Sequence, residues 1–342
     1  MYSRTPKEPG KFNKNPPKSC KCLKPNIIQK GRAGWGKGKI RIKCTKCEKW
    51  GQIDTTKKDA EAKIIKSKNV NIRKNPINLE SGIVKRVLVT PDKHFPLEDR
   101  PALNCTKRII ELADADTYVD LGDTVEANAV SRWNKNFDKL PLDYKITEID
   151  YEVGEATERW DDLDEALDKS SIKTKYFTMG NHDVRYDYFV ADYKVLKDKY
   201  AFIPLFELDK RGYNVIPFGE MLKIGKLHFY HGHHSGGISH ARTHLLRFGI
   251  NVIYGHHHSI QHYELGHVEG TKSATSLGCL KDLSGEANEW LKNLKHGWGH
   301  AVATVDFYDD GNFSINVHRI VGGKTVFYGE YIDGNKAKDK WL

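Results

Sequence analysis

The sequence predicts an α/β protein in which two β-sheets pack face to face, with helices on their outer sides. Apolar, β-branched runs, such as residues 84–90 and 117–121, alternate along the chain with segments whose apolar residues recur at helical spacing. From residue 260 onward alternating strand patterns dominate, and this change favours a second sheet. A length of 342 residues and a hydrophobic share of 39% are enough for one large domain and an appendage.

The elements expected in the large domain follow one another in chain order. Its first half contains strands at 84–90, 117–121 and 175–179 and helices at 100–113, 146–167 and 189–196. Its second half contains a two-stranded hairpin at 221–230, a helix at 240–248, a strand at 251–254, and later strands that turn at 309–312. The helix at 146–167 is long, acidic and amphipathic. We place the domain at residues 83–335.

Several classes of protein are disfavoured by the composition. No run of about 18 apolar residues is present, so we expect no membrane span. Residues 1–18 are basic and rich in proline and contain no apolar core, so we expect no secretory signal there. Six cysteines without such a signal indicate a reducing compartment, and we expect a cytoplasmic location. Cys105 and Cys279 are interpreted as ordinary buried thiols.

Positive charge is concentrated in the first quarter of the chain. Residues 1–86 contain 24 Lys or Arg and 6 Asp or Glu, a balance of +18, whereas the remainder has a balance of −8. A basic segment of this kind favours a polyanion, most simply nucleic acid, because binding releases condensed counterions. The alternative is a solvated tail without a partner.

Two cysteine pairs lie within the basic segment. Cys20 and Cys22 are followed by Cys44 and Cys47, a spacing suited to a tetrahedral structural zinc ion. The arrangement resembles the zinc ribbons of transposase-like and other DNA-binding proteins, although the first pair is C-x-C rather than C-x2-C. Four free thiols are the alternative. We assign a zinc-ribbon-like module to residues 1–50 and a linker to 51–82.

The zinc-ribbon-like module has its own candidate nucleic-acid contacts. Residues 39–43 alternate between basic and apolar and predict a strand, whose basic side chains would contact nucleic acid: Lys39, Arg41 and Lys43. Zinc ribbons also mediate contacts between proteins, so protein docking is the alternative role.

Five short runs rich in Asp, His and Asn each follow an apolar stretch of the large domain. They are Asp92-Lys93-His94, Gly122-Asp123, Gly180-Asn181-His182-Asp183, His231-Gly232-His233 and Gly255-His256-His257-His258. Ligands in layered α/β proteins bind at the carboxyl ends of strands, where these runs lie. A carboxylate can bridge two cations about 3.5–4 Å apart, the spacing used in two-metal hydrolysis. The runs therefore predict a two-metal hydrolytic site.

In their order, the five runs resemble the pattern of the calcineurin-like metallophosphoesterase superfamily: D-x-H, G-D, G-N-H-D or G-N-H-E, H, and G-H-x-H. The resemblance covers roughly residues 83–335 and implies the metallophosphoesterase fold. It implies one metal held by Asp92, His94 and His258, a second held by Asn181, His231 and His256, and Asp123 bridging the two.

The resemblance also implies a mechanism. His182 would protonate the leaving oxygen, oriented by Asp183, while a metal-activated hydroxide attacks phosphorus. We expect two divalent ions, Mn²⁺ first, with Fe or Zn²⁺ also compatible with mixed nitrogen and oxygen ligands. His240 and His244, four residues apart, either line a third metal site or form an ordinary polar helix face.

The expected substrate is DNA or RNA. Arg132 and Trp133, soon after Asp123, could clamp and stack a nucleotide, or they could pack the following helix. The run G-D-x-x-E-x-x-x-x-S-R-W resembles phosphoesterases of phages and prophages, which implies a bacterial or phage-infected cell. A phosphomonoesterase that uses the N-terminal module for protein docking is the alternative enzyme, and a nucleic-acid-binding scaffold with a vestigial site is the non-enzyme alternative. The oligomeric state stays open.

Overall fold

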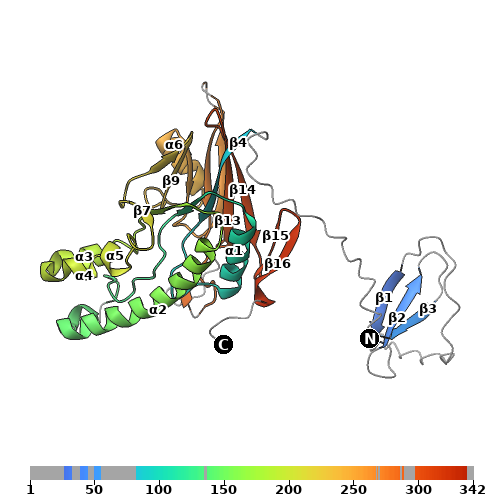
Figure 1. Ribbon diagram of the computed structural model, residues 1–342, viewed down its shortest axis with the longest axis horizontal. Helices are drawn as coiled ribbons and strands as arrows, with labels where there is room; N and C mark the ends of the chain where they lie inside the picture. Colours follow the sequence, from blue (N-terminus) through green and yellow to red (C-terminus); the bar gives the residue numbers. More distant parts are fainter. Residues whose placement is uncertain are drawn as a thin grey trace, which may run out of the picture. The chain divides into compact units, whose positions relative to one another are not determined.

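The computed structural model describes residues 27–32, 39–44, 50–54, 82–134, 137–266, 268, 270–285, 287–288 and 297–336 (Figure 1). The chain divides into two compact units, Met1–Asn71 and Ile72–Leu342. Each unit is described by itself. No helix among the described residues is both long enough and apolar enough to span a membrane.

The N-terminal unit contains a three-stranded antiparallel sheet. Its strands are β1 (Ile27–Arg32), β2 (Lys39–Cys44) and β3 (Trp50–Asp54), in the order β1-β2-β3. Strand β2 confirms the strand expected at 39–43 and ends at Cys44. The other three predicted zinc ligands, Cys20, Cys22 and Cys47, lie outside the described residues, and β3 overlaps the start of the expected linker at 51–82.

Two sheets form the large unit, which confirms the predicted two-sheet arrangement. The six-stranded sheet has the order β14-β13-β4-β5-β6-β7, and the five-stranded sheet has the order β11-β12-β10-β9-β8. Strands β4, β5, β6 and β7 run parallel, as do β9, β10 and β12. The larger sheet consists of β4 (Ile83–Thr90), β5 (Thr117–Asp120), β6 (Thr174–Thr178), β7 (Tyr213–Ile216), β13 (His300–Tyr308) and β14 (Phe313–Ile320).

The smaller sheet lies against one face of the larger one. It consists of β8 (Leu222–Ile224), β9 (Leu227–Tyr230), β10 (Asn251–Tyr254), β11 (Ile260–Leu265) and β12 (Lys272–Leu277). A separate hairpin, β15 (Lys324–Phe327) and β16 (Glu330–Asp333), follows β14 and precedes a short turn of helix, η6 (Gly334–Lys336).

Alternation along the strands explains why both faces of the larger sheet are buried. In β4, Val87 and Val89 pack with Phe229 and Ile253 of the smaller sheet, whereas Leu88 packs into the core under the helices. Successive side chains of a strand point to opposite faces, so one strand serves two cores. A nearly continuous apolar run is the sequence pattern of a strand buried on both faces.

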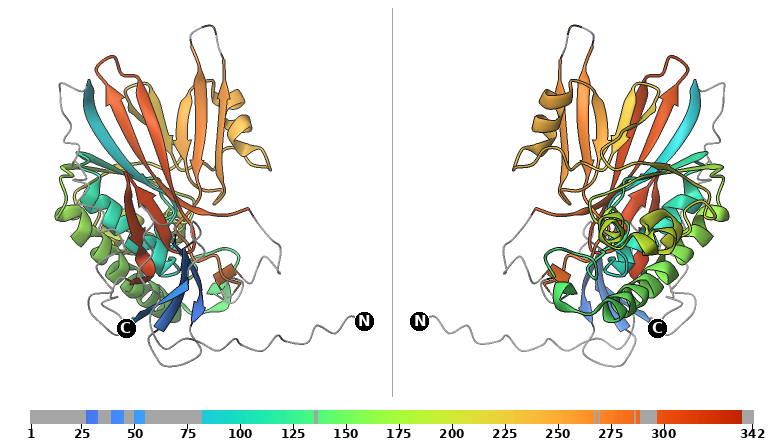
Figure 2. Two further views of the ribbon diagram at one scale, coloured as in Figure 1. Left: turned by 90° about the vertical axis from the view of Figure 1, so that its right-hand side faces the viewer. Right: turned by 90° about the vertical axis from the view of Figure 1, so that its left-hand side faces the viewer.

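Helices cover the outer faces of both sheets (Figure 2). The pair α1 (Arg100–Leu112) and α2 (Leu142–Asp168) packs with the larger sheet, and α6 (His240–Phe248) packs with the smaller one. Asp99 caps α1 by accepting the backbone N–H of Ala102, which satisfies one of the free donors at a helix start. In α2, Trp160 stacks on Phe177 of β6.

The expected helix at 189–196 has the wrong bounds. The structure has α3 (Arg185–Asp192), followed by η4 (Lys194–Leu196), α4 (Lys197–Tyr200) and α5 (Phe202–Leu205). Helix α2 begins at Leu142 rather than at residue 146, directly after a short turn, η3 (Phe137–Lys139). The edge strand β7 was not among the expected elements.

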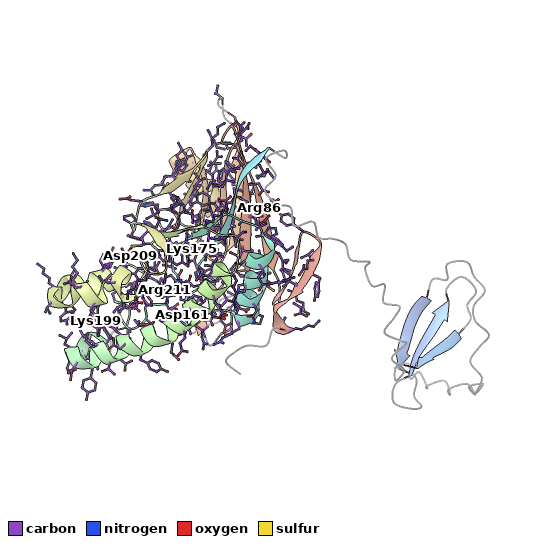
Figure 3. The ribbon with its side chains drawn as sticks, viewed as in Figure 1. Arg86, Asp161, Lys175, Lys199, Asp209 and Arg211 are labelled. Atoms are coloured by element: carbon purple, nitrogen blue, oxygen red, sulfur yellow. The ribbon has the colours of Figure 1, made fainter. Side chains whose placement is uncertain are left out.

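Ion pairs join neighbouring elements of the large unit, and Figure 3 labels Arg86, Arg211 and Asp161 among their members. The guanidinium of Arg86 in β4 donates to both carboxylate oxygens of Asp306 in β13, with Nε at 2.6 Å from Oδ1. Arg211 lies beside α2 and pairs with Asp161 at 2.6 Å. A bidentate guanidinium pair fixes geometry as well as charge, so Arg86 helps to fix the register of β4 against β13.

Candidate dinuclear metal centre

The predicted ligands lie just beyond the carboxyl ends of five strands. Asp92 and His94 follow β4, Asp123 follows β5, and Asn181 follows β6; His231 follows β9, and His256 and His258 follow β10. Because β4, β5 and β6 are parallel and β9 and β10 are parallel, these loops leave each sheet at one edge. Backbone contacts join the two edges: the backbone N–H of His256 donates to the carboxylate of Asp92.

The first ligand cluster combines Asp92, His94 and His258, which are all buried. The Nε2 atoms of His94 and His258 face each other at 3.0 Å, and Nε2 of His258 lies 3.3 Å from Oδ2 of Asp92. Burial lowers the pKa of His94 to about 4. Burial also lowers that of His258, but Cys279 and Asp92 outweigh it and raise the pKa of His258 to about 10. One ligand atom from each of the three side chains lies close to the other two, and a divalent cation would satisfy all three.

The second cluster combines Asp123, His231 and His256. Nε2 of His231 lies 3.1 Å from Oδ2 of Asp123, 3.1 Å from Nδ1 of His256 and 3.0 Å from Oδ1 of Asn181. Burial lowers the pKa of His256 to about 3, whereas for His231 the charge of Asp123 outweighs burial and raises the pKa to about 9. Like the first cluster, this one contains one carboxylate and two facing imidazoles, and the amide oxygen of Asn181 also lies within reach.

Hydrogen bonds on the far side of two rings select the nitrogen that faces each cluster. Nδ1 of His231 donates to the backbone carbonyl of Leu121 at 2.9 Å, and Nδ1 of His94 donates to Oε2 of Glu126 at 2.7 Å. Each ring therefore turns the lone pair of Nε2 toward its cluster. A second partner that fixes the tautomer is the usual support of a metal-binding histidine.

Four of the predicted ligands adopt the left-handed backbone region, which is uncommon for residues other than glycine. The φ angles are 55° for His94, 47° for Asp123, 67° for His256 and 57° for His258. Such conformations cost free energy and cluster at functional sites, where the surrounding structure enforces them. The strain lies in these loops rather than along the strands, which supports a functional role for them.

Glycines make room for the two carboxylates. A Cβ atom at Gly255 would lie 2.0 Å from Oδ1 of Asp92. Gly122 has a φ of 85°, and a Cβ there would lie 2.2 Å from the carbonyl oxygen of Thr178. Gly122 therefore permits the tight turn that aims Asp123, as its position before the aspartate predicts.

His182 lies beside the first cluster, but Asp183 does not orient it as the resemblance implied. The rings of His182 and His94 meet edge to face with centroids 4.6 Å apart. Nδ1 of His182 donates to the carbonyl of Glu126 at 2.5 Å, and Nη2 of Arg185 donates to its Nε2 at 3.0 Å. Burial lowers the pKa of His182, and the charge of Arg185 acts in the same direction.

Asp183 instead fixes the backbone that carries the ligands. Its Oδ2 accepts the N–H groups of Asp123 and Gly180, both at 2.8 Å, and its Oδ1 accepts that of Thr124 at 3.2 Å. The carboxylate is fully occupied by these donors, so it ties the loop after β5 to the loop after β6. Asp183 therefore supports the backbone of these loops, and the expectation that it orients the His182 ring is wrong.

Glu126 and Arg185 are site residues that the sequence interpretation missed. Glu126 accepts from His94 and also from the buried Nζ of Lys281 at 2.9 Å. Burial raises the pKa of Glu126, but His94 and Lys281 outweigh it and hold the pKa well below its usual value. Glu126 is the glutamate of the G-D-x-x-E run, to which no role was assigned from the sequence, and Arg185 lies two residues beyond the run that ends at Asp183.

His240 and His244 are held by ordinary hydrogen bonds, which favours the polar-face interpretation over a third metal site. His240 bonds Tyr254 at 2.7 Å and Ser259 at 2.6 Å. His244 bonds the carbonyls of His240 and Gly232. With His257 they could also hold an ion, but both ring nitrogens of His240 and of His244 already lie within hydrogen-bond distance of other groups.

Arg132 and Trp133 lie on the surface of the loop between β5 and α2. The indole of Trp133 is 73% exposed, and the guanidinium carbon of Arg132 lies 5.1 Å from its ring centroid. A Trp this exposed does not pack the following helix, so that alternative is disfavoured. The basic candidates Lys39, Arg41 and Lys43 all lie on β2 of the N-terminal unit.

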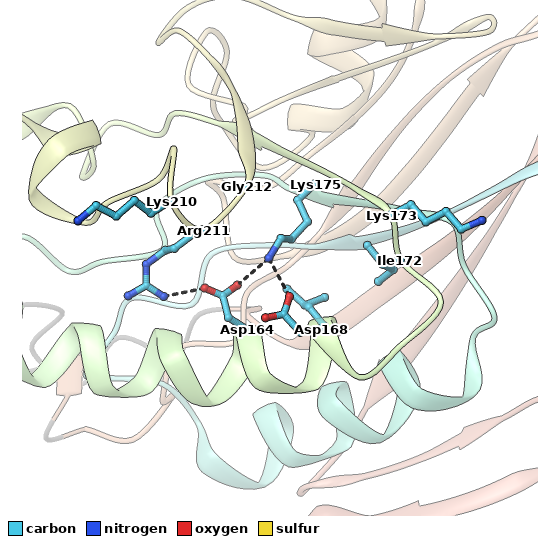
Figure 4. A pocket seen from close by; sticks show the side chains of 9 residues that line it. Asp164, Asp168, Ile172, Lys173, Lys175, Lys210, Arg211 and Gly212 are labelled. Atoms are coloured by element: carbon cyan, nitrogen blue, oxygen red, sulfur yellow. Dashed lines mark hydrogen bonds and ion pairs between the residues drawn. The ribbon is translucent and has the colours of Figure 1, made fainter.

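A separate cavity of about 480 Å³ opens beside the end of α2 (Figure 4). Its inner cations are neutralised locally: Lys175 pairs with Asp164 at 3.7 Å and with Asp168 at 3.2 Å, and Arg211 pairs with Asp164 at 2.6 Å. These pairs stabilise the join between α2 and β6. They leave little net attraction for an anion, so we assign this cavity no part in the site.

Comparison with known proteins gives distant relatives. No protein-family model matches the chain. The Gene 54 protein of Mycobacterium phage L5 is 26% identical over 238 residues, which cover 65% of this chain and 89% of the phage protein. The Gene 54 protein of Mycobacterium phage D29 is 26% identical over 237 residues, with the same two coverages.

Among solved structures, Vps29 proteins are similar to the chain. A single mutant of Vps29 from Entamoeba histolytica has 14% identity and a TM-score of 0.37, and the match covers 72% of this chain and 98% of that one. Vps29 of Chaetomium thermophilum has 10% identity and a TM-score of 0.37, with 70% and 92% covered. Vps29 from Cryptosporidium parvum has 13% identity and a TM-score of 0.37, with 70% and 94% covered. The function of the chain is therefore inferred from the residues of its own site.

Proposed function

We propose that the chain is a metal-dependent phosphoesterase and that its substrate is a phosphodiester of DNA or RNA. One observation carries the proposal: two clusters, each of one carboxylate and two facing imidazoles, lie at adjoining strand ends. Paired sites of this composition suit hydrolysis of phosphate esters by two cations. The fold alone decides nothing about chemistry, because one fold serves many functions.

The residues present fit two divalent cations. The first would be held by Asp92, His94 and His258, and the second by Asn181, His231 and His256, with Asp123 shared between them. Bound cations supply Lewis-acid chemistry, since they neutralise phosphate charge and make a water molecule nucleophilic at neutral pH. Mixed nitrogen and oxygen donors suit Mn²⁺, Fe or Zn²⁺, and Mn²⁺ is the first ion to test.

His182 is the proposed acid for the leaving oxygen. The Glu126 carbonyl holds its Nδ1 proton, so Nε2 is the atom that would face a substrate once Arg185 turns from it to the phosphate. Arg185 presents a guanidinium at that same atom and is placed to attract a phosphate oxygen. A negative phosphate beside Nε2 favours a protonated ring, which then gives its proton to the departing alkoxide.

Two surfaces support a nucleic-acid substrate. Trp133 is exposed next to Arg132, a combination on which a base can stack. The N-terminal 86 residues carry a balance of +18 and would bring a polyanion to the chain, with a zinc-held module as the proposed carrier. The relatives encoded by mycobacteriophages are consistent with a nucleic-acid context in an infected bacterial cell.

The proposal is tested by incubating the purified chain with end-labelled single- and double-stranded DNA and, in parallel, with an aryl phosphomonoester. We expect DNA cleavage that requires added Mn²⁺ and stops with a chelator. Hydrolysis of the monoester with the DNA intact would make the chain a phosphatase instead. No metal-dependent turnover on either substrate would contradict the phosphoesterase assignment.

A substitution of His182 by alanine separates the acid role from metal binding. We expect cleavage of DNA to fall by about 10²- to 10³-fold, because its alkoxide leaving group needs a proton, while hydrolysis of an activated aryl diester changes little. Turnover numbers on both substrates are the measurement. His262→Ala, in an exposed position on β11, is the matched control and is expected to retain both activities. Equal losses of His182→Ala on the two substrates would contradict the acid role.

The N-terminal module is tested through Cys44 at the end of β2. We expect Cys44→Ser to weaken DNA binding and flatten its dependence on salt, because fewer phosphates are then neutralised. Turnover on an aryl diester is expected to persist. Cys105→Ser, which alters a buried thiol in α1, serves as the control. Unchanged DNA affinity and salt slope in Cys44→Ser would show that the module does not deliver nucleic acid.

A further inference from the structure

Glu126 contacts several residues of the site at once, through both its side chain and its backbone. Its carboxylate accepts Nδ1–H of His94 at 2.7 Å and Nζ of Lys281 at 2.9 Å through one oxygen, Oε2. Its backbone carbonyl accepts Nδ1–H of His182 at 2.5 Å and Nη1 of Arg185 at 3.0 Å. One residue therefore holds a predicted ligand, the proposed acid and two cations.

The backbone of Glu126 is itself fixed. Its N–H donates to the carbonyl of Phe95 at 3.0 Å, and Phe95 forms a bridge with Val125 that joins the loops after β4 and β5. The next residue, Ala127, has a φ of 52°, which turns the chain sharply after the carbonyl. The carbonyl contacts thus depend on the backbone, whereas the contacts with His94 and Lys281 depend on the side chain.

We propose that Glu126 is the positioning residue of the metal centre: its carboxylate fixes the tautomer and direction of His94, and its carbonyl independently fixes His182. This inference rests on the proposed metal centre. A carboxylate behind a ligating histidine orients the ring and raises its basicity. Lys281, which is buried at the same oxygen, holds the carboxylate in place and offsets its charge.

The side-chain half of the proposal is tested with Glu126→Gln by measuring Mn²⁺ affinity without substrate. The amide keeps the size of the side chain and one acceptor oxygen, but it has no negative charge to attract the His94 proton and Lys281. We expect Mn²⁺ affinity to fall by about 10- to 100-fold, the range found when such outer partners are changed. If the wild-type chain binds no Mn²⁺, the metal centre and this inference both fail; if wild type and Glu126→Gln bind equally, only the role of Glu126 fails.

Glu152→Gln is the matched control. Glu152 on α2 accepts the backbone N–H groups of Asn128 at 2.6 Å and Ala129 at 2.8 Å, so it holds the same loop without touching a histidine. We expect its Mn²⁺ affinity to match the wild type. An equal loss in Glu152→Gln would show that the centre responds to any loosening of the loop and would overturn the proposal.

A spectroscopic readout separates positioning from general damage. In ¹⁵N-histidine spectra of the full chain, we expect Glu126→Gln to shift the ring signals of His94 and to leave those of His182 unchanged, because His182 bonds the carbonyl. Lys281→Gln is a second variant, expected to lower the Mn²⁺ affinity and shift the His94 signals less than Glu126→Gln does, since Glu126 still accepts from His94. A change of both rings together in Glu126→Gln, or a loss of affinity in Lys281→Gln as large as in Glu126→Gln, would overturn the proposal.

Discussion

Substitution of Asp123 by asparagine is expected to abolish turnover while leaving the fold and the affinity for nucleic acid intact. Asparagine keeps an oxygen to accept the backbone N–H of His182, which donates to Oδ1 at 2.7 Å, so the loop persists. It removes the negative charge that faces Nε2 of His231 at 3.1 Å. Loss of about 6 kcal/mol of metal-dependent stabilisation corresponds to a fall of about 10⁴-fold in rate.

The measurement is the turnover number on DNA together with DNA affinity and bound Mn²⁺. Asp116→Asn is the control, because Asp116 is a carboxylate of the same sheet that pairs with Lys85 away from the ligand loops. Asp123→Asn should lose turnover and bound metal but keep DNA affinity, whereas Asp116→Asn should keep all three. Turnover retained in Asp123→Asn would contradict the assigned centre.

The largest effect on stability is expected at Lys93. The side chains of Lys93 and Asp120 are both 0% exposed, and Nζ lies 2.8 Å from Oδ2. The Nζ of Lys93 contacts Asp120 and Thr124 rather than the ligand atoms of Asp92 and His94. Lys93→Met would leave the charge of Asp120 buried without its partner. Removing one member of such a pair costs about 3–5 kcal/mol in the free energy of unfolding.

Unfolding in urea measures this loss, and Lys85→Met provides the comparison. Lys85 lies in β4, the strand before Lys93, and pairs with Asp116 at 3.3 Å, but the two side chains are 40% and 30% exposed. A pair of that kind contributes about 0–1 kcal/mol. Equal losses of stability in Lys93→Met and Lys85→Met would contradict the larger contribution expected of the buried pair between Lys93 and Asp120.

The structure brings the predicted ligands together because each run that carries them follows a strand. A run such as residues 84–90 is recognisable by composition, and the polar residues after it stand out against it. Parallel pairing then brings Asp92, Asp123 and Asn181 to one edge without any further information. The fold class follows from this local pattern, whereas the division of the ligands between two clusters came from the resemblance.

The groups that support the ligands could not be predicted in the same way. Glu126 and His94 are 32 residues apart, and Lys281 is 155 residues from Glu126, so only the folded chain brings them together. The resemblance assigned Asp183 to His182, yet the carboxylate of Asp183 accepts three backbone N–H groups. Adjacent side chains on a tight turn point in different directions, and a sequence motif does not specify these directions.

Errors in element bounds have a related cause. The expected helix at 189–196 was placed by its apolar spacing, whereas α3 begins at Arg185, directly after the motif that carries Asn181 and His182. Edge strand β7 is only four residues long and was not expected, because so short a run carries little periodicity. In both cases tertiary contacts, rather than local pattern, set the boundary.

Anomalous X-ray scattering from crystals of the chain grown with Mn²⁺ tests the central claim most directly. We expect two peaks, one contacted by Asp92, His94 and His258 and one by Asn181, His231 and His256, with Asp123 in contact with both. A peak confined to His240, His244 and His257, or no peak at either predicted cluster, would contradict the dinuclear centre and with it the proposed function.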